Sequence, residues 1–343
     1  TIGWAELGAV KSLLPNPIVR YSLVTIPALI FSLLSSCTLS PLTSTLSNCL
    51  KNTTPCPEKC KTKLWQYLLV GITAVVTITI CSKSSPIYPF NDWLDANCFF
   101  TVGKSVANGQ VLYKDIYEQK GPYLYFLHSL YYLISPDTFL GGYIFEIIAC
   151  FFFLFVSYKT LLLFASEKSI WAIPILSAFI YSSPYFAHGG SAEEYCLPFL
   201  SLPLYFGLKY VAKRESISYS KWFVIGLTAS VVFWIKYTMA GIYVGIWLYL
   251  LFVSIMRKDI KRFLISILPL LAGLLLGSVP VFVYFIMNDA TGDLFNVYFY
   301  NNIFSYSVKT PAANEVQQST VTTAGRRTDI LAYSKMIEIL IVL

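Results

Sequence analysis

Charged side chains gather in one segment of an otherwise apolar chain. Eight of the 39 residues from 82 to 120 are charged, and aromatic side chains lie among them. A carboxylate in such a setting can act as a general base toward a hydroxyl group, and a lysine can stabilise a departing phosphate. The segment is therefore a candidate active site. Its charged residues are Lys83, Asp92, Asp95, Lys104, Lys114, Asp115, Glu118 and Lys120.

Asp95 falls in the first turn of an amphipathic helix predicted for residues 93–108. Apolar residues recur at positions 96, 99, 102, 103 and 106, which is the spacing of one helix face. Asn91 or Asp92 can cap the start of this helix, and Gly109 can end it. The helix dipole favours an ionised carboxylate at Asp95. Asp95 is thus a candidate base, although acidic residues are also common at helix starts for structural reasons.

The stretch 113–122 carries four charges directly before a Gly-Pro pair that opens an apolar helix. Charges in such a place are costly unless they pair with one another or bind a ligand. Both a solvated loop with local Lys–Asp pairs and a binding site agree with this pattern.

The composition indicates a membrane protein. Only 13% of the 343 residues are charged and 56% are hydrophobic, whereas a soluble domain carries about 25% charged residues. This excludes a cytosolic enzyme, a disordered tail and a basic nucleic-acid binder, despite the net charge of +7. A bilayer-spanning helix needs about 20 mostly apolar residues. The predicted spans are 64–81, 139–163, 170–186, 195–211, 222–235, 239–256 and 263–287, with a further one from about 330 and a shorter candidate at 22–36. We expect an all-α polytopic bundle of about seven to nine spans.

The distribution of lysine and arginine predicts the orientation of these spans. Four basic clusters at alternate ends of the spans hold 14 basic and four acidic residues. The intervening loops, 82–120, 188–194 and 288–329, hold seven basic and ten acidic residues. Because basic residues are retained on the cytoplasmic side, the segment 82–120 faces outward. The same count makes residues 121–135 an interfacial helix rather than a span.

The chain begins at Thr1 and ends within an apolar run, so we expect a fragment. Residues 1–63 form a separate segment, and residues 64–343 form a membrane domain that is truncated at its C-terminus and whose first outward loop is 82–138. The eight cysteines are expected to be free thiols, because Cys56 and Cys60 have no histidine nearby and a zinc site needs three or four ligands.

Several polar and small residues within the helices carry further expectations. His128 should lie at the polar edge of the interfacial helix, and His188, beside two glycines, in a turn. Glu146 lies seven residues into the span 139–163, or about 10 Å deep, and an intramembrane carboxylate is a functional candidate. Gly241-x3-Gly245 and Gly273-x3-Gly277 allow close helix approach.

Three motifs in the first outward loop resemble those of the GT-C membrane glycosyltransferases. They are Asp95-x7-Gly103, then Asn108-Gly109-x3-Tyr113-Lys114-Asp115, then Glu118-x-Lys120-Gly121-Pro122. They look most like the motifs of the dolichyl-phosphate-mannose-protein mannosyltransferase-like superfamily, which includes the bacterial relatives of protein O-mannosyltransferases and the lipid A aminoarabinose transferase. Leu112 stands where that family usually has proline, and Glu118 stands where aspartate is common.

The resemblance continues beyond this loop and covers about residues 64–290. The second outward loop, which ends in Glu193 and Glu194, is similar to the family's loop between its third and fourth spans. Lys236, at the outer end of a predicted span, also looks like a family feature.

The resemblance implies an integral membrane glycosyltransferase in the plasma membrane. It would move a sugar from a polyprenyl-phosphate carrier to an acceptor outside the cytoplasm, which is a cell-surface glycan, a lipid or a protein. Asp95 would be the general base of an inverting displacement, and Lys120 and Lys236 would stabilise the phosphate.

The remaining candidates would bind the substrates. Glu118 or Asp115 would orient the lysines, Glu193 and Glu194 would contact sugar hydroxyls or the acceptor, and Asp92 belongs to the same set. The scheme requires no cofactor and no metal, although so dense a group of carboxylates could hold a divalent cation.

Two other functions remain open on the sequence alone. A transporter or flippase would also be polytopic, but its site would lie near the bilayer midplane on paired broken helices, and no such pairing is evident. A lipid-linked polysaccharide polymerase or ligase would use the same carrier to join whole glycans. Arginines in a late outward loop would mark it, and Arg326 and Arg327 are the only ones there.

Overall fold

The computed structural model describes residues 62–305 apart from 184, 185, 187 and 214. This part of the chain is built from helices and contains no strand, which confirms the predicted all-α class. The short candidate span at 22–36, the Cys56–Cys60 pair and the apolar run near residue 330 lie outside the described residues.

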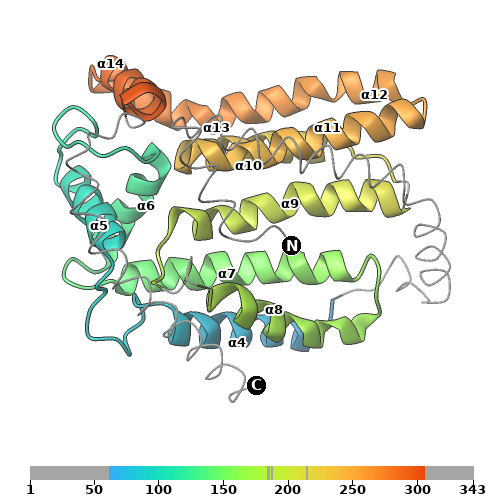
Figure 1. Ribbon diagram of the computed structural model, residues 1–343, viewed down its shortest axis with the longest axis horizontal. Coiled ribbons are helices and arrows are strands. Elements are labelled where there is room, and N and C mark those ends of the chain that lie inside the picture. Colours follow the sequence, from blue (N-terminus) through green and yellow to red (C-terminus); the bar gives the residue numbers. More distant parts are fainter. Residues whose placement is uncertain (1–61, 184–185, 187, 214, 306–343) are drawn as a thin grey trace, which may run out of the picture.

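Long apolar helices run side by side through the bundle (Figure 1). They are α4 (Leu64–Cys81), α7 (Leu140–Leu161), α9 (Ala192–Lys213), α10 (Tyr219–Ile235), α11 (Gly241–Met256) and α13 (Ile267–Met287). Four segments are long and apolar enough to cross a bilayer, and α10 is a shorter apolar helix. These four segments are Leu64–Cys81, Leu140–Leu161, Tyr237–Met256 and Ile260–Met287. The protein is a helical membrane bundle.

The predicted span 170–186 is shorter than expected. It consists of the 3₁₀ turn η1 (Glu167–Trp171) and the ten-residue helix α8 (Ala172–Tyr181). Ten residues rise about 15 Å, which is half of the roughly 30 Å hydrocarbon core. Two serines and Pro184 follow in the sequence, and the residue before a proline disfavours helical dihedrals. The helix therefore ends at Tyr181, before the end of the predicted span.

Close packing between α10 and α13 depends on small residues. A Cβ atom on Gly273 would lie 2.0 Å from the carbonyl oxygen of Phe223, and one on Gly226 would lie 1.9 Å from that of Leu270. The Gly273-x3-Gly277 prediction is thus confirmed. Gly241-x3-Gly245 makes no such approach within the described part of the chain, because a Cβ on either glycine meets nothing within 4 Å. Such a motif permits close approach but does not supply a partner helix.

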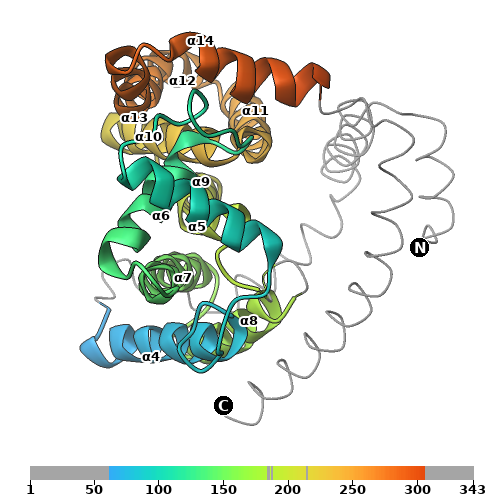
Figure 2. The same ribbon diagram turned by 90° about the vertical axis from the view of Figure 1, so that its left-hand side faces the viewer.

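Two shorter helices, α5 (Leu94–Ala107) and α6 (Pro122–Ile134), lie across one end of the bundle (Figures 1 and 2). The predicted face of α5 is buried, and Gly109 follows the helix with a φ of +92°. The 13 residues of α6 rise about 20 Å, which is too short to cross a bilayer. Both helices thus agree with the amphipathic and interfacial helices predicted for this region.

The connections between the long helices that are rich in lysine and arginine lie at one end of the bundle. The basic connections α7–η1, α9–α10 and α11 to α12 (Ile260–Ile265) lie at the end of the bundle opposite α5 and α6 (Figure 1). The end that carries α5 and α6 also carries α14 (Thr291–Leu294) and the π-helical segment η3 (Phe295–Ser305). The alternation of charge predicted along the chain is therefore a separation between the two ends of the molecule.

Candidate active site

Asp95 lies half-buried in the first turn of α5. Cys98 follows one turn later on the same helix, and the charges that act on its thiol indicate which side chains lie near Asp95. Partial burial raises the pKa of the Cys98 thiol, the nearby carboxylates of Glu118 and Asp95 raise it further, and Lys120 opposes them. Asp95, Glu118 and Lys120 are therefore all near enough to act electrostatically on one thiol, although twelve residues of chain separate the end of α5 from Lys120.

Hydrogen bonds hold the backbone around Lys120 in place. The Lys120 amide donates to Oε2 of Glu118 and to the hydroxyl of Tyr125, each at 3.1 Å. The hydroxyl of Tyr113 donates to the carbonyl oxygen of Lys120. Tyr113 itself is buried, has a positive φ of 69° and stacks on Phe285 of α13. The Tyr-Lys-Asp element thus serves to anchor the lysine that follows it.

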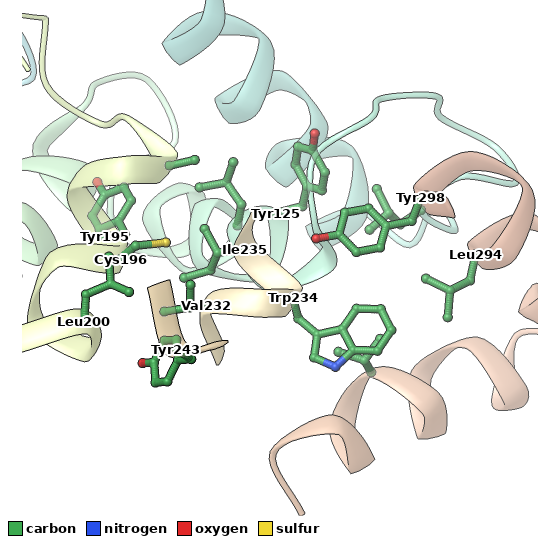
Figure 3. Close-up of a cluster of buried hydrophobic side chains, with 14 of the residues drawn as sticks. Tyr125, Tyr195, Cys196, Leu200, Val232, Trp234, Ile235, Tyr243, Leu294 and Tyr298 are labelled. Carbon is green, nitrogen blue, oxygen red and sulfur yellow. The ribbon is translucent and has the colours of Figure 1, made fainter. Parts of the chain in front are cut away.

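Gly121 brings this element against the end of α10. Its amide donates to the carbonyl oxygen of Ile235 at 3.0 Å. A Cβ on Gly121 would lie 2.0 Å from the carbonyl oxygen of Trp234, so only glycine fits. In Figure 3 Ile235 lies between Tyr125 of α6 and Tyr195 of α9. The end of α10 packs between the starts of α6 and α9. This packing places Lys236 near Lys120.

Glu193, in the first turn of α9, completes the group. It forms an ion pair with Lys236, in which the lysine Nζ donates to Oε1 of Glu193, and Lys120 also acts on it electrostatically. Both partners are partly exposed, with 27% of the lysine side chain and 37% of the glutamate side chain accessible. Asp95, Glu118, Lys120, Glu193 and Lys236 are referred to below as the acid–lysine cluster.

Three other candidate residues, Asp92, Asp115 and Glu194, lie outside this cluster. Asp92 is exposed and paired with Lys83; partial burial acts to raise its pKa, but the hydrogen bond and charge of Lys83 leave it lowered. Asp115 is exposed, and its Oδ2 accepts the amide of Val111 at 2.7 Å, which closes the turn after α5. These interactions organise the loop around the cluster.

Glu194 points away from its neighbour Glu193. It is fully buried, and its Oε2 accepts the amide of Gly190 at 3.1 Å. Glu146 of α7 is also fully buried and approaches the same glycine loop, since a Cβ on Gly190 would lie 3.5 Å from its Oε1. The sequence marked Glu146 as a candidate but contained no signal that it would lie close to Glu194.

Both histidines pack against aromatic side chains. His188 stacks on Trp93, with ring centroids 5.6 Å apart, and its carbonyl accepts the amide of Lys83 in a turn, as predicted. His128 is not at a polar edge: it is 1% exposed and packs against Phe99 and Tyr131. Burial lowers its pKa to about 3, so the ring is neutral near pH 7. The α5–α6 contact covers the face that the sequence suggested was polar.

An apolar cavity of about 570 Å³ lies among α10, α11, α13 and η3. Aromatic side chains line much of it, including Phe233, Trp234, Trp247, Phe282 and Phe299. Trp234 stacks on Tyr298 of η3, as Figure 3 shows, and donates to Oγ of Ser278 at 2.9 Å. Trp234 is two residues from Lys236, so the cavity reaches the last turn of α10, directly before that lysine.

Cys98 was not among the candidates from the sequence, although its position three residues after Asp95 marks the same helix face. Among the described residues, no group of three or more His, Cys, Asp or Glu side chains is arranged to hold a metal ion.

Comparison with known proteins agrees with this architecture. Residues 119–284 match the model of the dolichyl-phosphate-mannose-protein mannosyltransferase family. The match begins at the Lys-Gly-Pro element and ends in α13, so it includes Lys120, Glu193 and Lys236. Searches of the curated proteins and of the solved structures gave no match. The matched segment and the apolar helices support a membrane glycosyltransferase of the GT-C, mannosyltransferase-like type.

Proposed function

We propose that the protein transfers a sugar from a polyprenyl-phosphate carrier to an acceptor outside the cytoplasm, with inversion at the anomeric carbon. The observation that carries the proposal is the Gly121–Ile235 contact. Lys120 precedes Gly121 and Lys236 follows Ile235, so this contact brings two lysines from distant parts of the chain near each other. They lie beside the helix that carries Asp95. Two cations and a carboxylate are the groups that displacement of a phosphate by a hydroxyl requires.

In the proposed reaction, the oxygen of the acceptor hydroxyl attacks the anomeric carbon. Its proton passes to the carboxylate of Asp95 as the bond from the anomeric carbon to the phosphate oxygen breaks. The electrons of that bond remain on the departing polyprenyl phosphate, whose growing charge Lys120 and Lys236 stabilise. Glu118 keeps the backbone of Lys120 in position through its hydrogen bond.

The apolar cavity is the proposed site of the carrier's isoprenoid chain. Its aromatic lining offers apolar surface to a hydrocarbon chain. It reaches Trp234, two residues before Lys236, so a phosphate at the cluster and a hydrocarbon tail in the cavity can belong to one molecule. A simple sugar nucleotide would leave this cavity unused.

The orientation of the protein is a separate proposal with its own test. We expect the end that carries α5 and α6 to face outward, because the basic connections lie at the opposite end. Gln110, after α5, and Ser220, at the start of α10, are both exposed. A membrane-impermeant maleimide should label Gln110→Cys in intact cells and Ser220→Cys only after permeabilisation, each above the background of the parent chain. The reverse pattern would contradict both the orientation and the extracytoplasmic reaction.

The function itself is tested by mass spectrometry of cell-surface glycans, glycolipids and glycoproteins from cells with and without the gene. We expect one sugar to disappear from one acceptor class in the cells that lack it. Restoration by the wild-type gene but not by Asp95→Asn would tie that loss to the cluster. If the acceptors are unchanged while lipid-linked sugars accumulate on the cytoplasmic face, the protein is a flippase and the proposal is wrong.

A further inference from the structure

The ion pair between Lys236 and Glu193 affects how Lys236 can bind a phosphate. A carboxylate pairs with one of the two lysines proposed to hold the phosphate. Glu193 is partly exposed and lies in the first turn of α9, where its side chain can leave the lysine without unfolding the helix. A phosphate that binds Lys236 therefore competes with this carboxylate for the charge of the lysine.

The chemistry of the reaction changes the charge that the lysines meet. The donor is a phosphodiester with one negative charge. The product, polyprenyl phosphate, is a monoester with a charge of about −1.5 to −2 at pH 7, since its second pKa is about 6. The charge is balanced by the proton that Asp95 takes from the acceptor. Two lysines without a counter-charge would therefore hold the product more tightly than the donor.

We propose, on the basis of the function proposed above, that Glu193 is the counter-charge that releases the product. It yields Lys236 to the phosphate of the donor and returns to the lysine as the product leaves. Glu193 is thus a positioning residue that sets the affinity for the carrier phosphate. It takes no part in the bond changes at the sugar.

The test measures binding of farnesyl phosphate, a short prenyl monoester, to the purified full-length chain by isothermal titration calorimetry. Removal of a competing charged hydrogen bond should make Glu193→Gln bind it about tenfold more tightly at pH 8. The gain should shrink at pH 5.5, where the ligand is largely a monoanion. In transfer assays the same variant should lose kcat, with a burst in the first turnover, while its KM for donor falls.

Glu215→Gln is the matched control. It removes the carboxylate of a similar, partly exposed Lys–Glu pair, Lys209–Glu215, at the opposite end of α9, and it should bind farnesyl phosphate as the wild type does. Unchanged or weaker binding by folded Glu193→Gln would overturn the proposal, as would an equal gain in Glu215→Gln. If Glu193→Gln does not fold, Glu193→Asp should still bind several-fold more tightly because its shorter side chain loosens the pair. Unchanged affinity in that variant would also overturn the proposal.

Binding and transfer distinguish the two proposals. Tighter binding by Glu193→Gln without sugar transfer by any form of the protein would contradict the proposed function alone. Sugar transfer by the wild type without any gain in binding would contradict the role of Glu193 alone.

Discussion

The Asp95→Asn protein is expected to insert normally into the membrane and to lose sugar transfer by a factor of about 10² to 10⁴, the usual contribution of a general base. Asparagine has nearly the size and shape of aspartate, so the half-buried first turn of α5 can keep its structure. The amide cannot accept the proton of the acceptor hydroxyl at neutral pH. The initial rate of transfer, normalised to the amount of protein in the membrane, measures the effect.

Asp137→Asn is the control for this experiment. Asp137 is an exposed carboxylate at the same end of the bundle, in the loop after α6, and lies outside the acid–lysine cluster. We expect its transfer rate to match that of the wild type. Activity of Asp95→Asn close to that of the wild type would show that another group removes the proton.

The Gly121→Ala protein is expected to be less stable and nearly inactive. The added Cβ would lie 2.0 Å from the carbonyl oxygen of Trp234 and 2.4 Å from its carbonyl carbon, both of which are backbone atoms. The start of α6 must then move away from the end of α10, and the hydrogen bond from Gly121 to Ile235 breaks. Overpacking of this kind costs about 1–3 kcal/mol. Because the same movement separates Lys120 from Lys236, transfer should fall further than the folded fraction does.

The thermal midpoint of the solubilised protein and the activity of its folded fraction test this prediction. Gly245→Ala is the control, because a Cβ at that position in α11 meets no atom within 4 Å. Alanine also has the higher helix propensity, so this variant should be as stable as the wild type or slightly more stable. A Gly121→Ala protein as stable and active as Gly245→Ala would mean that the Gly121–Ile235 contact does not organise the site.

Local patterns in the sequence predicted a helix well where one face and the C-terminal end carried a signal. α5 is the clearest case: its apolar spacing marked the buried face, and Gly109 marked its end. The start was predicted less well, since neither Asn91 nor Asp92 caps α5, whose N-cap is Trp93. α8 shows the limit, since the predicted span ran on to residue 186 across the Ser-Ser-Pro sequence at which the helix has already stopped. The same limit applies to His128, whose burial results from packing between α5 and α6, which no local pattern describes.

The candidate site was predictable as a set of residues but not as an arrangement. The resemblance supplied Asp95, Lys120 and Lys236, and the charge pattern assigned them to one side of the membrane. Their proximity depends on a glycine contact between α6 and α10, and a contact between segments so far apart in the chain leaves no periodic signal. Asp92 and Asp115 carry the same charge as Asp95 and occur in the same loop, yet they hold the loop together.

By itself the sequence determined that this is a membrane protein whose few charges are unevenly distributed, with eight of them in residues 82–120. The scarcity of charge and its distribution along the chain are local properties. Only the tertiary structure decided which of those charges meet. Glu193 and Glu194 show this, because they are neighbours in the chain and the sequence assigned both of them the same role. Successive residues of a helix point about 100° apart, so Glu193 reaches Lys236 while Glu194 is buried beside Glu146, and the neighbouring helices gave each carboxylate a different partner.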